Sequence, residues 1–135
     1  MIVADELCVA IEREADIVSA RQQGRTLAAA IGFSSTDQTM IALAISEITR
    51  NILSYAQRGQ VTISELDDGA RRGILVVARD DGPGIADIAL AMRDGYSTGR
   101  SLGVGLPGAK RVMDEFELVS APGQGTTVTM KKWRR

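Results

Sequence analysis

The side chains that could do chemistry in this chain are carboxylates, amides and hydroxyls, because histidine is absent and Cys8 is the only cysteine. The absence of histidine removes the commonest general base and any catalytic triad built on histidine. A single cysteine in a chain without histidine also argues against a zinc site. Any catalysis would therefore rest on carboxylates, amides, hydroxyls and glycine backbone, together with a hard cation if a metal is used.

Glu47 and Asn51 form the first candidate cluster, four residues apart in the sequence. Apolar residues around them recur at helical spacing, which predicts a helix with one buried face. Those residues are Ile41, Ile45, Ile48, Ile52 and Tyr55. Residues four apart leave the same side of a helix, so the carboxylate and the amide should stand together at the edge of the core. Taken alone, such a pair is more often an ordinary pair on a helix surface.

A second cluster is the run D-D-G-P-G, which begins with Asp80 at the end of an expected strand. Alternation along residues 74–80 places Asp80 on the buried face of the sheet. A carboxylate there needs a hydrogen-bonding partner, which a ligand's amino group and a water could supply. Gly82 and Gly84 would allow close approach of the backbone and φ values that other residues resist. A plain surface turn would need neither an inward Asp nor two spaced glycines.

The third cluster is a set of glycines that leads into a helix: Gly99, Gly103, Gly105 and Gly108. Backbone N–H groups at a helix N-terminus favour an anion such as phosphate. The run also fits G-x-G-x-x-G, but a dinucleotide fingerprint follows a strand directly, whereas a polar loop precedes this one. The Walker A pattern fails because Lys110 follows an alanine, and the H-R-D and D-F-G signatures of protein kinases are absent.

The elements expected to position these clusters are five strands and four helices. Strands are predicted at 8–11, 61–66, 73–80, 117–121 and 126–133, and helices at 15–31, from about 35 to 57, at 86–93 and at 104–116. Asp67-Asp68-Gly69 predicts a hairpin turn. We expect Ser35, Thr36 or Asp37 to cap the second helix, and Gly59 to close it. The pattern predicts an α+β fold: a single domain over 1–135 with helices on one face of a mixed, mostly antiparallel sheet.

Composition narrows the function classes. The formal net charge of -1 lacks the basic excess that nucleic-acid binding uses, so no nucleic-acid partner is expected. The basic residues at 131–135 are interpreted as a solvated chain end. The most apolar stretch, 40–48, is too short to cross a bilayer, so no membrane association is expected. The N-terminus has no signal-peptide pattern and one cysteine allows no internal disulfide, which together favour the cytoplasm.

The order and spacing of the clusters resemble the ATP-binding boxes of the gyrase, Hsp90, histidine-kinase and MutL (GHKL) superfamily. These boxes are E-x-x-x-N on a helix, D-x-G-x-G after a strand, a flexible segment, G-x-G opening a helix, and G-x-G-T on a late strand. The last box is Gly123, Gly125 and Thr126 here. The resemblance implies a two-layer α/β sandwich of the Bergerat type that binds ATP and Mg²⁺.

The resemblance also implies a role for each matching residue. Asp80 would bind the adenine amino group with the help of a water and Thr126, while Gly84 would lie against the base. Asn51 would coordinate Mg²⁺, and Glu47 would be the general base that activates the acceptor. The other residues implied for the nucleotide site are Gly82, Gly99, Gly103, Gly105 and Leu106, the last four as lid and phosphate contacts.

Longer motifs resemble one group of the superfamily, the stand-alone serine/threonine kinases of bacterial partner switching that act with the stressosome. They are A-D-I-V-S-A-R from Ala15, S-E-I-T-R-N from Ser46, D-G-Y-S-T-G from Asp94 and G-L-P-G-A-K-R-V-M-D-E-F from Gly105. The phosphoacceptor histidine of histidine kinases is absent. The resemblance implies that the protein phosphorylates a STAS-domain antagonist, the stressosome scaffold, and then activates a PP2C-type phosphatase.

Two alternatives share the same site. One is an anti-sigma factor with kinase activity that binds a sigma subunit, and the other is a pseudokinase that holds nucleotide only to shape a docking surface. Retention of Glu47 argues against the pseudokinase. We also expect residues 94–104, where Arg100 and Ser101 depart from the small residues common in related chains, to be loosely packed without nucleotide.

Overall fold

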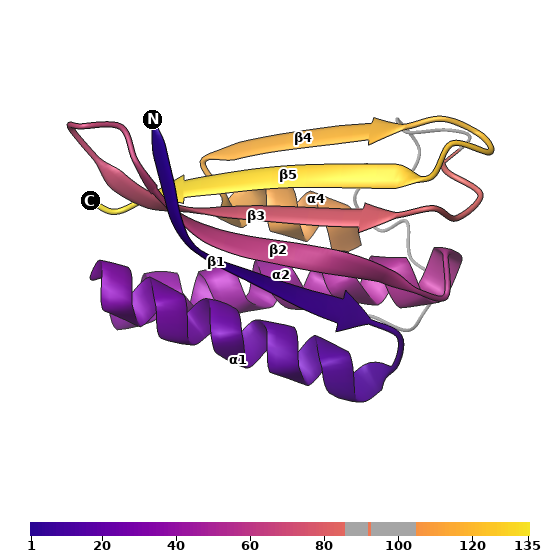
Figure 1. Ribbon diagram of the computed structural model, residues 1–135, viewed down its shortest axis with the longest axis horizontal. Helices are drawn as coiled ribbons and strands as arrows, with labels where there is room; N and C mark the ends of the chain where they lie inside the picture. Colours follow the sequence, from indigo (N-terminus) through magenta and orange to yellow (C-terminus); the bar gives the residue numbers. More distant parts are fainter. Residues whose placement is uncertain (86–91, 93–104) are drawn as a thin grey trace.

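The computed structural model describes residues 1–85, 92 and 105–135. Apart from residue 92, the helix predicted at 86–93 and the loose packing predicted for 94–104 lie outside the described residues. The described strands form a five-stranded sheet in the order β1-β2-β3-β5-β4, and all four pairings are antiparallel (Figure 1). Their bounds are Ile2–Ile11 for β1, Gly59–Asp67 for β2, Arg72–Asp80 for β3, Glu115–Ser120 for β4 and Thr126–Trp133 for β5.

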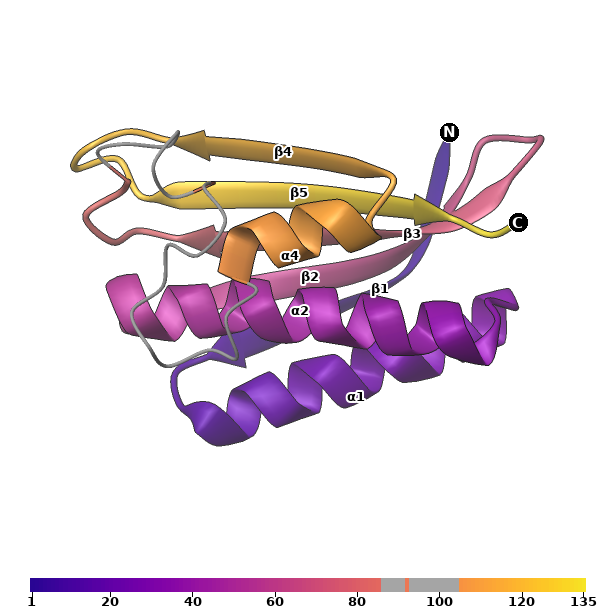
Figure 2. The same cartoon turned by 180° about the vertical axis from the view of Figure 1, so that it is seen from behind.

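The described helices cover one face of this sheet, as Figures 1 and 2 show. They are α1 (Glu14–Ile31), α2 (Ser35–Tyr55) and α4 (Gly105–Val112). The predicted α+β two-layer sandwich is therefore confirmed, with a sheet that is antiparallel throughout its described strands. The end of β3, the end of α2 and the start of α4 lie at the same end of the molecule (Figures 1 and 2).

Several predicted element bounds are wrong, mostly because strand pairing decides where an element begins or ends. The cap of α2 is Ser34, whose hydroxyl accepts a hydrogen bond from the Asp37 amide, so the capping position lies one residue earlier than predicted. Gly59 does not close α2, because the helix ends before Ala56 and Gly59 already pairs with Ile11 as part of β2. The fourth predicted helix stops at 112 rather than 116, because β4 begins at 115 and pairs with β5. The first strand runs from residue 2, with a break in register between residues 4 and 7.

The core lies between the sheet and the helices. The isoleucines of the predicted stripe on α2 are all buried, but Tyr55 at its end is 41% exposed and does not belong to the core. The basic C-terminus is a solvated chain end only at Arg134 and Arg135, which are exposed, because β5 continues to Trp133, which is 3% exposed. Lys132 Nζ donates to the Val112 carbonyl and an Arg134 guanidinium nitrogen donates to the Ile31 carbonyl, so this segment ties α4 and α1 to the sheet.

Helices α1 and α2 approach closely at Gly24. A Cβ on Gly24 would overlap with Cδ1 of the fully buried Ile45, while its next neighbours, Ile45 Cγ1 at 3.6 Å and Ile63 Cδ1 at 3.7 Å, are at ordinary contact distance. One methyl group of Ile45, Cδ1, therefore fills the space that a side chain at position 24 would need.

Two turns meet at the end of β3. The amide of Gly123 in the β4–β5 turn donates to the Pro83 carbonyl at 2.7 Å. Gly125 has φ +75, and a Cβ there would overlap with the backbone oxygen of Asp80. Only glycine fits this position without displacing the backbone that carries Asp80.

We predict that Gly24→Ala lowers the free energy of unfolding by about 1 kcal/mol, because crowding at Ile45 (about 1–3 kcal/mol) outweighs the gain in helix propensity of about 1 kcal/mol. In an Ile45→Val background, which removes the crowding methyl, the same change should be neutral or stabilising. Urea unfolding of the four proteins gives the coupling. An equal effect of Gly24→Ala in both backgrounds would contradict the proposed contact.

We also predict that Gly125→Ala lowers the free energy of unfolding by about 3 kcal/mol or more, because a positive φ (about 1–2 kcal/mol) and a backbone clash combine. Gly123→Ala is the matched control, since Gly123 has φ +76 but a Cβ added there would meet nothing within 4 Å. Its cost should be about 1–2 kcal/mol, from the backbone conformation alone. Equal losses in the two variants would show that the approach to Asp80 does not matter.

Candidate functional site

Three polar side chains cross the sheet in one row at the end of β3. Asp80 pairs with Thr126 of β5, and Thr126 pairs in turn with Ser120 of β4. Asp80 is 8% exposed and Thr126 is 7% exposed. The predicted inward orientation of Asp80 is thus confirmed. We call Asp80, Thr126 and Ser120 the polar row.

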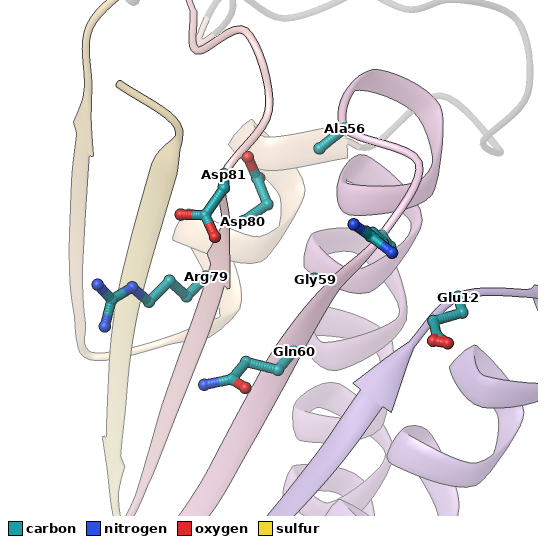
Figure 3. Close-up of a pocket in the computed structure, with 8 residues that line it drawn as sticks. Glu12, Ala56, Gly59, Gln60, Arg79, Asp80 and Asp81 are labelled. Atoms are coloured by element: carbon teal, nitrogen blue, oxygen red, sulfur yellow. The ribbon is translucent and has the colours of Figure 1, made fainter. Parts of the chain in front are cut away.

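The turn after β3 holds the Asp80 carboxylate against the end of α2. Asp80 Oδ1 accepts a hydrogen bond from the Gly82 amide at 2.9 Å. A Cβ on Gly82 would lie 2.5 Å from the Ala56 Cβ, so this turn touches the helix as only glycine allows. Gly84 has φ +77, a positive value that residues other than glycine resist, as predicted. Asp81 leaves the strand on the other side from Asp80, as Figure 3 shows.

Ser120 is the member of the polar row that was not predicted from the sequence. Its hydroxyl accepts from the Ile85 amide at 2.7 Å, donates to the Gly125 carbonyl at 2.9 Å and lies 2.8 Å from Thr126 Oγ1. One hydroxyl therefore joins the turn after β3 to the last residue of the β4–β5 turn and to the first residue of β5. The signal available in the sequence was a serine six positions before Thr126, across a tight hairpin.

On α2, Glu47 and Asn51 lie where the helical spacing predicted them, at the edge of the core. Glu47 is 7% exposed and Asn51 is half-buried. Carboxylates are rarely this buried without a specific role or partner. The hydroxyls beside Glu47 are directed to their own helix, since Ser46 donates to the Ala42 carbonyl and Thr49 to the Ile45 carbonyl.

The glycine-rich cluster is described only in part. Gly105 opens α4 with φ +48, and Leu106 is buried in the core, so the predicted helix start is confirmed there. Helix α4 packs against α2, which brings its first turn beside the helix that carries Glu47 and Asn51. Gly99 and Gly103 lie outside the described residues.

An open hollow of about 440 Å³ adjoins the polar row at the ends of β1, β2 and β3 (Figure 3). Its lining consists of Glu12, Ala56, Arg58, Gly59, Gln60, Arg79, Asp80 and Asp81. Among the described residues of this lining, Asp80 is the only predicted site residue. Of the remaining predicted residues in the described part of the chain, Gly82 and Gly84 lie in the turn after β3, and the others lie on α2, α4 and β5.

Neither a cluster of metal ligands nor a membrane-spanning helix is found among the described residues. No group of three or more His, Cys, Asp or Glu in the described part of the chain could hold a metal ion. None of the described helices has the length and apolar character needed to span a membrane.

Comparison with known proteins matches these features to one family. Residues 11–132 match the histidine kinase-like ATPase domain. The serine/threonine-protein kinase RsbT of Bacillus subtilis (strain 168) is 50% identical over 131 residues, which cover 97% of this chain and 98% of the relative. The anti-sigma F factor of Thermoanaerobacter sp. (strain X514) is 34% identical over 99 residues, covering 69% of this chain and 68% of that protein.

Solved structures show the same fold at lower identity. The crystal structure of the RsbU and RsbW domains of Rv1364c from Mycobacterium tuberculosis superimposes with a TM-score of 0.66 at 20% identity, covering 98% of this chain and 33% of that one. The mycobacterial sensor histidine kinase MprB gives a TM-score of 0.56 at 14% identity, covering 96% of this chain and 98% of that one. The chain belongs to the histidine kinase-like ATPase family and, within it, to the serine/threonine-protein kinases of the RsbT type.

Proposed function

We propose that this protein binds Mg-ATP on the helix side of the sheet and transfers the γ-phosphoryl group to a serine or threonine of a STAS-domain antagonist. The observation that carries this proposal is the position of two buried carboxylates. Asp80 lies at the end of β3, and Glu47 lies on the helix that ends beside it. A carboxylate is costly to bury in an apolar core, so buried carboxylates are typical of binding or catalytic sites.

The nucleotide base would be held by the polar row. Asp80 and Thr126 offer acceptor oxygens side by side, which suits the amino group of adenine and an accompanying water. Gly82 packs against Ala56 and Gly84 against the Ala121 carbonyl, so neither position has room for a Cβ and the turn stays close to its neighbours. The base is proposed to lie against the backbone at Gly84. The phosphates would then run towards the first turn of α4, where Gly105 and Leu106 stand and the helix dipole favours negative charge. Gly99 and Gly103 are proposed to add lid contacts.

Asn51 is the residue proposed to hold Mg²⁺. Its amide oxygen is the kind of hard ligand that Mg²⁺ takes, and this ion commonly binds through one or two protein ligands together with substrate phosphates. When bound, Mg²⁺ would neutralise charge on the phosphates. The half-buried position of Asn51, one turn beyond Glu47 on α2, fits that arrangement.

Glu47 is the proposed general base. The acceptor hydroxyl oxygen forms a bond to the γ-phosphorus while the bond from that phosphorus to the bridging oxygen of ADP breaks. The hydroxyl proton passes to the Glu47 carboxylate, and ADP leaves with the bridging oxygen. Phosphoryl transfer depends chiefly on positioning and charge neutralisation, so the contribution of Glu47 is to orient and deprotonate the acceptor.

The proposed partners rest on the resemblance to the serine/threonine kinases of bacterial partner switching. The RsbT relative matches over nearly the full length of both chains, whereas the anti-sigma F factor relative matches over about two thirds. This difference favours a switch kinase that phosphorylates a STAS-domain protein of a stressosome and then activates a PP2C-type phosphatase. The alternative is an anti-sigma factor with kinase activity, for which direct binding of a sigma subunit would decide.

We predict that Glu47→Gln lowers the rate of phosphoryl transfer by about 100-fold or more, because general-base catalysis typically contributes about 10²–10⁴-fold. The Kd for Mg-ATP should change less than threefold. Asp80→Asn should instead raise the Kd for ATP by about tenfold or more, because it replaces an acceptor oxygen of the adenine contact with an amide donor. Asp81→Asn is the matched control, since Asp81 is exposed and its carboxylate points to the other side of the chain from that of Asp80 (Figure 3). Calorimetric binding and single-turnover transfer separate the two roles. Normal binding and transfer in both variants would show that the site is assigned wrongly.

The first experiment on function is incubation with labelled Mg-ATP and a purified STAS-domain protein encoded beside the gene, followed by mapping of the phosphorylated residue. Label on a serine or threonine of that protein, lost with Glu47→Gln, is the expected result. Nucleotide binding without any label would instead favour the anti-sigma or pseudokinase alternative.

A further inference from the structure

Ser120 has one hydroxyl proton and three polar neighbours. The Ile85 amide can only donate to it, and the Gly125 carbonyl can only accept from it. The third neighbour is Thr126 Oγ1 at 2.8 Å, which by itself could donate or accept. Because the proton of Ser120 is used on Gly125, the one arrangement that makes all three contacts hydrogen bonds has Thr126 donating to Ser120.

We propose that Ser120 is a positioning residue that fixes the direction of the Thr126 hydroxyl and so makes the site selective for a purine that carries an amino group. This inference rests on the proposed function, which places adenine beside Asp80 and Thr126. With its proton directed to Ser120, Thr126 presents only lone pairs on its remaining side. Its neighbour Asp80 is also an acceptor when ionised.

The resulting site offers two acceptor groups side by side and no hydroxyl donor from the polar row. An amino group at position 6 of the purine, or a water between it and the row, can donate to both acceptors. A carbonyl oxygen at that position would meet lone pairs and leave polar groups unpaired, which costs affinity. Selectivity for ATP over a 6-oxopurine nucleotide is thus built by rejection as well as by attraction.

Ser120 can exert this effect only through Thr126. If Ser120 is removed, the Thr126 proton is released and can turn to donate to a carbonyl oxygen. Loss of Ser120 should therefore relax selectivity, rather than weaken both nucleotides equally as a general loosening of the turn would. This difference separates a positioning role from a merely structural one.

The test measures the Kd of ATP and of inosine triphosphate, each with Mg²⁺, by calorimetry. Inosine triphosphate has a carbonyl in place of the amino group and a proton on N1. The wild type should prefer ATP, so that the ratio of the Kd of inosine triphosphate to the Kd of ATP is well above one. Ser120→Ala should reduce this ratio by roughly tenfold. Ser120→Thr, which keeps the hydroxyl, should retain the ratio. Ser64→Ala, the same change at a buried serine of β2, is the matched control and should leave it unchanged.

A double-mutant cycle with Thr126→Val tests the route of the effect. In that background Ser120→Ala should have no further influence on the ratio. Three outcomes would each overturn the inference and leave the proposed function standing. They are an undiminished effect of Ser120→Ala on the ratio in the Thr126→Val background, an unchanged ratio in Ser120→Ala alone, and a wild type that binds the two nucleotides equally. A wild type that binds neither nucleotide would overturn both. If Ser120→Ala does not fold, Ser120→Cys, which keeps the size but weakens both hydrogen-bonding functions, takes its place with the same expected loss.

Discussion

Burial of two carboxylates in the single core of a small sandwich is the constraint on which the rest of this structure depends. Asp80 and Glu47 come from different layers, yet both are almost fully buried between the sheet and the helices. Placing an ionised carboxylate in such a position costs several kcal/mol unless hydrogen bonds or a ligand compensate for the lost water. The fold must therefore supply apolar burial elsewhere, and it must keep the polar end of the core rigid enough to hold these groups in place.

The apolar burial comes from one helix face and from the strands beneath it. The isoleucines of α2 lie along the same helix that carries Glu47 and Asn51, so one element anchors the core and presents the polar groups at its edge. The rigidity comes from backbone contacts at the other layer. The Gly82 amide binds Asp80, and the approach of Gly125 to the Asp80 carbonyl leaves no room for a side chain. Glycine in these turns is thus a requirement of packing as well as of backbone conformation.

Features governed by local rules could be predicted from the sequence. The alternation of residues in β3 predicted that Asp80 faces inward, and the spacing on α2 predicted the joint position of Glu47 and Asn51 at the core edge. Features governed by long-range contacts could not. Whether Gly59 ends a helix or begins a strand depends on its pairing with Ile11, and the C-terminal basic residues are ordered because β5 pairs with two neighbours. Ser120 could not be predicted because its importance comes from register: only the pairing of β4 with β5 places it beside Thr126.

The division of the site between two layers has a physical consequence for a switch protein. The groups proposed to hold the base belong to the sheet, where a continuous ladder of hydrogen bonds fixes their spacing. The groups proposed for Mg²⁺ and for the acceptor belong to α2, which reaches the sheet through apolar side chains. Affinity for the base and competence for transfer can therefore vary separately, because a small shift of a helix over an apolar surface breaks no hydrogen bond of the sheet. A partner that contacts α2 or α4 could alter transfer while the base remains held, which is the kind of control that a kinase exchanged between partners requires.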